Sequence, residues 1–64
     1  MITYWVVLLF DDLEGKSHQV EVTITAKSRH EAYEASLELV SDLSRDKGWS
    51  LRDAVVTDCR NQLN

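Results

Sequence analysis

The alternation of apolar and polar residues predicts a β-hairpin in the first part of the chain. Residues 2–10 (ITYWVVLLF) are apolar at both alternating sets of positions, so this strand is covered on both faces or has one face that awaits a partner. Residues 11–17 (DDLEGKS) carry three acids and Gly15, which can adopt a positive φ in a turn. Residues 18–26 alternate strictly, which is typical of an antiparallel strand with one face in water.

A helix is predicted next, with a start and an end that are both marked in the sequence. Ser28 and Glu31 form a capping box, in which the Ser28 hydroxyl accepts a hydrogen bond from the Glu31 amide and the Glu31 carboxylate accepts one from the Ser28 amide. Gly48 is placed for a left-handed C-terminal cap. At about 100° per residue, the face that packs on the sheet spans about 140°. Its residues are Ala32, Ala35, Ser36, Leu39, Val40 and Leu43.

The segment 50–63 fits either a strand or a helix. A strand from Ala54 to Arg60 would alternate Val55, Thr57 and Cys59 with Ala54, Val56 and Asp58, whereas a helix would be capped by Ser50. We favour the strand, because Val-Val-Thr is β-prone and a third strand gives the hairpin a viable sheet. The prediction is a single α+β domain, 1–64, of order ββαβ, with a three-stranded antiparallel sheet and one helix on one face.

Charge and composition narrow the functional classes. The 64 residues include seven basic and eleven acidic side chains, for a net charge of −4, which disfavours direct binding of nucleic acid and favours a basic surface on another protein. No apolar run approaches the roughly 20 residues of a membrane span, and the N-terminus lacks the pattern of a signal peptide. The single cysteine is typical of a reducing compartment, so we expect a cytoplasmic protein.

Candidate catalytic and metal-binding residues are few. Cys59, His18 and His30 are spread along the chain without the spacing of a zinc site or of a nucleophile with its base. Glycine-rich phosphate-binding motifs are absent from the sequence. We therefore expect no enzymatic activity, metal or cofactor, and Cys59 with a histidine is the one enzymatic alternative.

An acidic row is predicted on one side of the helix. Its members are Glu31, Glu34, Glu38 and Asp42. Their spacings of three, four and four residues place all four carboxylates within about 80° of arc, where like charges repel and Arg45 is the base placed to relieve them. The row is a solvated helix surface, a docking strip for a basic protein, or a mimic of nucleic acid that blocks a nuclease or a CRISPR effector.

A second apolar set lies on the first strand, opposite the predicted core. It consists of Trp5, Val7 and Leu9. One helix covers only one face of a small sheet, so these side chains either meet solvent or are covered by Leu51 and Leu63, by a second copy of the chain, or by a partner. Trp49 is either a contact at the helix cap or an interface anchor, since tryptophan is enriched at binding hot spots.

Part of the chain resembles a known family. The matching residues are the strand 18–26, Ser28, Glu31, Ala32, Glu34, the pair Tyr4-Trp5, and the segment 56–60. They resemble the small bacteriophage-encoded inhibitors of host bacterial RNA polymerase, whose last strand carries two alternating arginines. Arg60 matches the second arginine, whereas Asp58 stands in place of the first and reverses its charge.

The resemblance implies a compact, non-enzymatic domain that binds the polymerase through Arg60 and acidic side chains. We therefore expect a small phage or mobile-element protein, acting in the host cytoplasm, that inhibits a host machine with a basic surface. The alternatives are the acidic mimic of nucleic acid and a homodimeric assembly module joined through Trp5, Val7 and Leu9.

Overall fold

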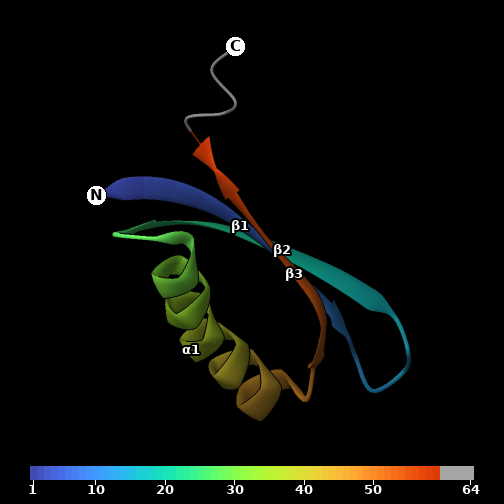
Figure 1. The fold of residues 1–64 in the computed structure, drawn as a ribbon. Helices are drawn as coiled ribbons and strands as arrows, with labels where there is room; N and C mark the ends of the chain where they lie inside the picture. The colour runs from blue at the N-terminus through green and yellow to red at the C-terminus, as the bar shows by residue number, and fades with distance from the viewer. Residues whose placement is uncertain (60–64) are drawn as a thin grey trace.

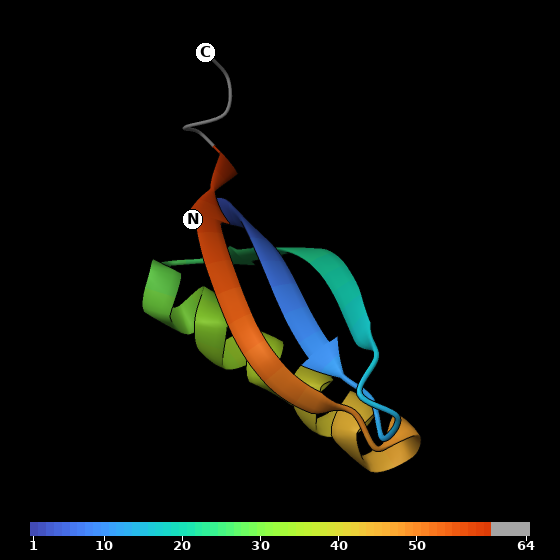
Figure 2. The ribbon, with the colours of Figure 1, turned by 90° about the vertical axis from the view of Figure 1, so that its right-hand side faces the viewer.

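The computed structural model describes residues 1–59 and confirms the predicted ββαβ order (Figure 1). Its elements are β1 (Ile2–Asp11), β2 (Ser17–Ala26), α1 (Arg29–Lys47) and β3 (Ser50–Asp58). The sheet order is β2-β1-β3, and β1 is antiparallel to both neighbours. Figure 2 shows β1 between the two other strands, with α1 behind the sheet. The strand interpretation of the last segment is therefore confirmed, although the strand begins at Ser50 rather than Ala54. Arg60 and Leu63 lie outside the described residues.

The hairpin turn is built around the side chain of Asp12. Its Oδ1 accepts hydrogen bonds from the amides of Glu14, at 2.8 Å, and Lys16, at 2.9 Å. Gly15 has a φ of 83°, in the left-handed region that glycine adopts without steric cost. The turn thus satisfies its backbone amides locally, as expected of an aspartate in this position.

The core lies between α1 and one face of the sheet. Alternate residues of β1 point into it, namely Tyr4, Val6, Leu8 and Phe10, and all four are buried. Ala32 and Ser36 are the buried residues of the helix, and Leu39, Val40 and Leu43 pack against the core from its second half. Ala35 was predicted to face the sheet but is exposed, because it lies at the margin of the buried arc.

Both ends of α1 are capped. The Ser28 hydroxyl accepts the Glu31 amide at 3.2 Å, which confirms half of the predicted capping box. The second predicted hydrogen bond of the box is wrong, because the Glu31 carboxylate accepts a hydrogen bond from the amide of Lys27, at 3.0 Å, and not from that of Ser28. At the far end Gly48 has a φ of 71° and its amide donates to the Ser44 carbonyl.

Candidate protein-binding surfaces

The sheet face that points away from α1 carries an apolar stripe, here called the open face. Its central residues are Trp5, Val7 and Leu9 of β1 and Val55 of β3. Trp5, Val7 and Leu9 are half-buried between their neighbours on the sheet, and Val55 is 48% exposed. Leu51 does not cover this face, because it packs against the core cluster on the side of α1. Within residues 1–59, the helix lies on the opposite side of the sheet from the open face.

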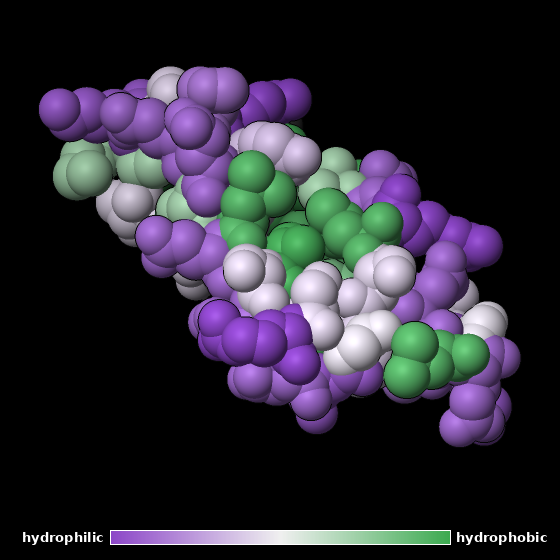
Figure 3. Space-filling model, turned by 90° about the horizontal axis from the view of Figure 1, so that it is seen from below, coloured by the Kyte–Doolittle hydropathy of each residue, from purple (hydrophilic) through white to green (hydrophobic). Residues whose placement is uncertain are grey.

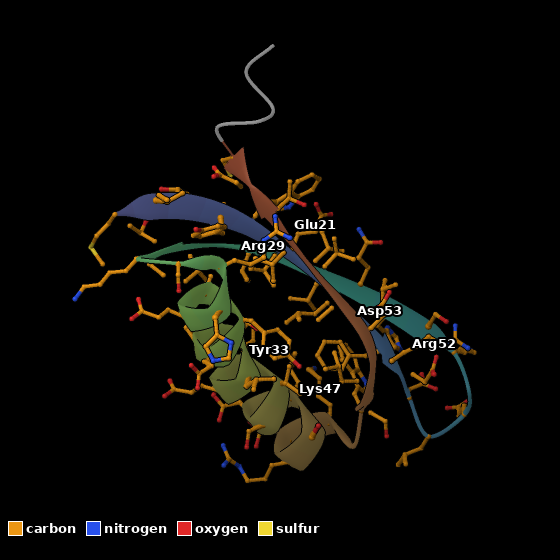
Figure 4. The ribbon with its side chains drawn as sticks, viewed as in Figure 1. Glu21, Arg29, Tyr33, Lys47, Arg52 and Asp53 are labelled. Atoms are coloured by element: carbon orange, nitrogen blue, oxygen red, sulfur yellow. The ribbon has the colours of Figure 1, made fainter. Side chains whose placement is uncertain are left out.

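Charged side chains flank the open face. Glu21 lies across from Val7 and Asp53 across from Leu9, and Asp11 follows at the end of β1. The register of β3 shifts at this point, and Arg52 pairs with Asp11 at 3.3 Å. Three carboxylates against one guanidinium leave two net negative charges on this side of the sheet. Figure 4 shows Glu21, Arg52 and Asp53 on the strands.

The acidic row of the helix is exposed, as predicted, but most of it is engaged within the chain. Glu31 accepts the amide of Lys27, Glu34 lies 3.0 Å from the ring of His30, and Asp42 lies 2.8 Å from Arg45. His30 thus contacts one carboxylate of the row, and Arg45 pairs with another. Since exposed ion pairs contribute about 1 kcal/mol or less, these contacts leave the row accessible to a partner.

Trp49 packs against other residues of the chain at the end of the hairpin. Its ring stacks on His18 with 4.2 Å between centroids, lies 5.7 Å from Phe10, and has the Lys47 ammonium 5.3 Å away. Trp49 therefore packs against the hairpin as well as against the end of α1, and its role as an interface anchor stays a prediction. His18 is half-buried, because the stacked indole covers it. Its Nε2 lies 2.9 Å from Asp12, and this hydrogen bond is the main cause of a lowered pKa at Asp12.

A hollow of about 500 Å³ between α1 and β3 was not predicted from the sequence. Its lining residues are Arg29, His30 and Tyr33 of the helix and Ala54 and Val56 of the strand. Figure 4 places Arg29 and Tyr33 along the N-terminal half of α1. From the side on which α1 lies, apolar atoms gather in the middle of the surface, between polar rims (Figure 3). Arg29 and Tyr33 are four residues apart and so share one flank of the helix, which is the signal for this site in the sequence.

The described part of the chain holds no group of three or more histidine, cysteine or acidic side chains placed to bind a metal ion. Cys59 is a free cysteine, and the residue is half-buried. Among residues 1–59, no helix has the length and apolar character needed to cross a membrane.

Comparisons with protein-family models, with curated proteins and with solved structures find no match. Function therefore has to be inferred from the geometry and charge of these surfaces.

Proposed function

We propose that this domain is a non-enzymatic protein-binding module that docks its open face on a basic, partly apolar surface of another protein. The observation that supports this most strongly is the apolar stripe on the face without a helix, with Val55 48% exposed. Protein interfaces commonly have an apolar centre surrounded by a polar or charged rim. Tryptophan, here Trp5, is among the residues most enriched at the centres of such interfaces.

Charge favours a basic partner over a second copy of the chain. Two open faces packed together would oppose two net negative charges with two more, in addition to the net charge of −4 on each chain. A lysine- or arginine-rich surface would instead be attracted to Glu21 and Asp53, which accelerates association and disfavours wrong partners. The homodimer alternative thus becomes an outcome to be tested by sedimentation equilibrium.

The resemblance to the phage-encoded inhibitors makes bacterial RNA polymerase the first partner to test, with the domain as a phage or mobile-element inhibitor of that host machine. Purified polymerase would be titrated with the wild-type domain, and binding and transcription would both be measured. Affinity capture from bacterial lysate at low and raised salt would extend the search to other complexes, since electrostatic docking weakens as salt screens the charges.

Variants distinguish the open face from the acidic row. Val55→Lys introduces a charge at the exposed edge of the apolar stripe, and Glu21→Lys reverses a flanking acid. Each should weaken partner binding by about tenfold or more. Leu13→Lys is the matched control, because Leu13 is 86% exposed at the tip of the hairpin, outside the open face.

Charge reversal in the acidic row of the helix tests the alternative that the domain mimics nucleic acid. If the domain instead mimics nucleic acid through its acidic row, the triple replacement of Glu34, Glu38 and Asp42 by lysine should abolish binding while Val55→Lys leaves it intact. Docking through the open face predicts the reverse order of effects. Full binding by both Val55→Lys and Glu21→Lys would refute the proposal.

A further inference from the structure

The outer edge of β3 is open to another strand. In the order β2-β1-β3, β3 pairs on one side with β1, and none of residues 1–59 forms a strand on its other side. The amide of Ala54 donates to Oδ1 of Asp53, at 2.9 Å, and therefore points away from β1. Because alternate residues of a strand direct their amides to the same edge, the amide and carbonyl of Val56 point outward as well.

The same two residues line the hollow. Ala54 and Val56 are opposite Leu8 and Val6, which are buried in the core, so their side chains lie on the α1 side of the sheet. A chain segment paired with this edge would place every second side chain on that side, directly beside the hollow. Edge pairing and occupation of the hollow are therefore geometrically coupled.

The chemistry of the hollow is apolar at the strand and cationic at the helix. Tyr33 adds a 37% exposed ring to the apolar wall. Arg29 brings a permanent positive charge and makes no ion pair with a described residue, whereas Arg45 and Arg52 are each held by carboxylates. The complementary group is an apolar side chain with a carboxylate close by.

We propose that the α1–β3 hollow receives an extended segment of a protein partner, which pairs with the outer edge of β3, inserts an apolar side chain and places a carboxylate at Arg29. The two side chains must be two residues apart, since only alternate residues reach the same side. Strand addition with side-chain pockets is an established mode of peptide recognition. This inference rests on the proposed protein-binding function and adds a second contact to it.

The test uses the intact domain and defined peptides, followed by amide NMR titration. The probe is the acetylated and amidated peptide Thr-Ser-Leu-Thr-Glu-Thr-Ser, together with the form in which Leu and Glu are exchanged, because strand direction is open. We expect saturable shifts at Arg29, Tyr33, Ala54 and Val56. Replacing the peptide Glu by Gln should weaken binding about threefold or more, and moving Glu next to Leu should weaken it equally.

Variants of the domain test each contact. Arg29→Gln should remove the preference for Glu over Gln, while the control Lys27→Gln, an exposed cation just before the helix, should retain it. Asp53→Ala frees the outward amide of Ala54 and should tighten peptide binding about twofold or more, since that amide then pairs with the peptide. A merely structural role for Asp53 predicts no gain.

Four results would overturn the inference. They are no shifts around the hollow at millimolar peptide, equal binding of the peptide with adjacent Leu and Glu, a preference for Glu that survives Arg29→Gln, and binding of free 4-methylpentanoate as tight as that of the peptide. The last result would mean that the strand edge contributes nothing. Glu21→Lys changes the open face on β2, at the opposite edge of the sheet from the hollow, so peptide binding should persist in this variant while open-face docking weakens, and the two losses are separable.

Discussion

Two adjacent leucines of β1 offer the sharpest test of the two faces of the sheet. Leu8 is 0% exposed in the core, whereas Leu9 is half-buried on the open face. Leu8→Ala leaves a cavity enclosed by the sheet and helix, which costs about 2–5 kcal/mol. Leu9→Ala removes the same atoms from a face without a covering layer, where water fills the space, so only part of the transfer free energy is lost, about 1 kcal/mol. A 64-residue domain has about 3–10 kcal/mol of stability in total.

Urea unfolding monitored by tryptophan fluorescence measures the difference. With a slope of about 1 kcal/mol per molar urea, Leu8→Ala should lower the midpoint by about 2 M or more and Leu9→Ala by about 1 M. If Leu8→Ala does not fold, the pair Leu8→Val and Leu9→Val gives the same ordering at smaller cost. Equal losses at both positions would refute the reasoning, because they would mean that the open face is covered in solution. A midpoint that rises with protein concentration would then identify a second copy as the cover.

Three further predictions concern the turn and the helix ends. The His18 ring and the turn amides lower the pKa of Asp12. The charged Asp12 carboxylate therefore stabilises the fold above the ordinary carboxyl pKa, and this stability is lost as the pH falls through the lowered pKa. Asp12→Asn should lower the urea midpoint at pH 6, and the midpoints of the variant and the wild type should become equal in acid. Ser28→Ala removes the N-cap and should cost about 1 kcal/mol, visible as a loss of melting temperature of about 4–8 °C. Gly48→Ala forces a φ of 71° on alanine and should cost about 1 kcal/mol by the same measurement, with Gly48→Asn less destabilising.

The fold was accessible from the sequence because local patterns agreed with one another. The strict alternation of 18–26 and the cap at Ser28 each specify an element within a few residues, and both elements form where predicted. The segment after Gly48 was ambiguous, since its apolar residues fit a strand and a helical stripe alike. Pairing with β1 decides between them, and that pairing is a tertiary contact that periodicity in the segment itself does not encode.

The candidate surfaces could be predicted from the sequence only in part, because some of them also depend on tertiary contacts. The apolar character of Trp5, Val7 and Leu9 on the face opposite the core follows from alternation alone. The roles of His18 and Trp49 do not, because their stacking joins β2 to the connection between α1 and β3, which is distant in the sequence. The hollow likewise exists only because α1 and β3, separated by a turn in the sequence, lie with a gap between their flanks.

The open face and the hollow meet at β3, and this strand sets how a partner can engage both. Val55 belongs to the open face and Val56 to the hollow, so successive residues of one edge strand present opposite sides of the sheet. The charges differ as well, because carboxylates flank Val55 whereas Arg29 lies on the side of Val56. A partner that grips this edge would therefore need basic side chains toward the open face and an acidic one toward α1. Such opposed charges fix the orientation of docking more strongly than an apolar contact does, since a reversed partner would bring like charges together on both sides.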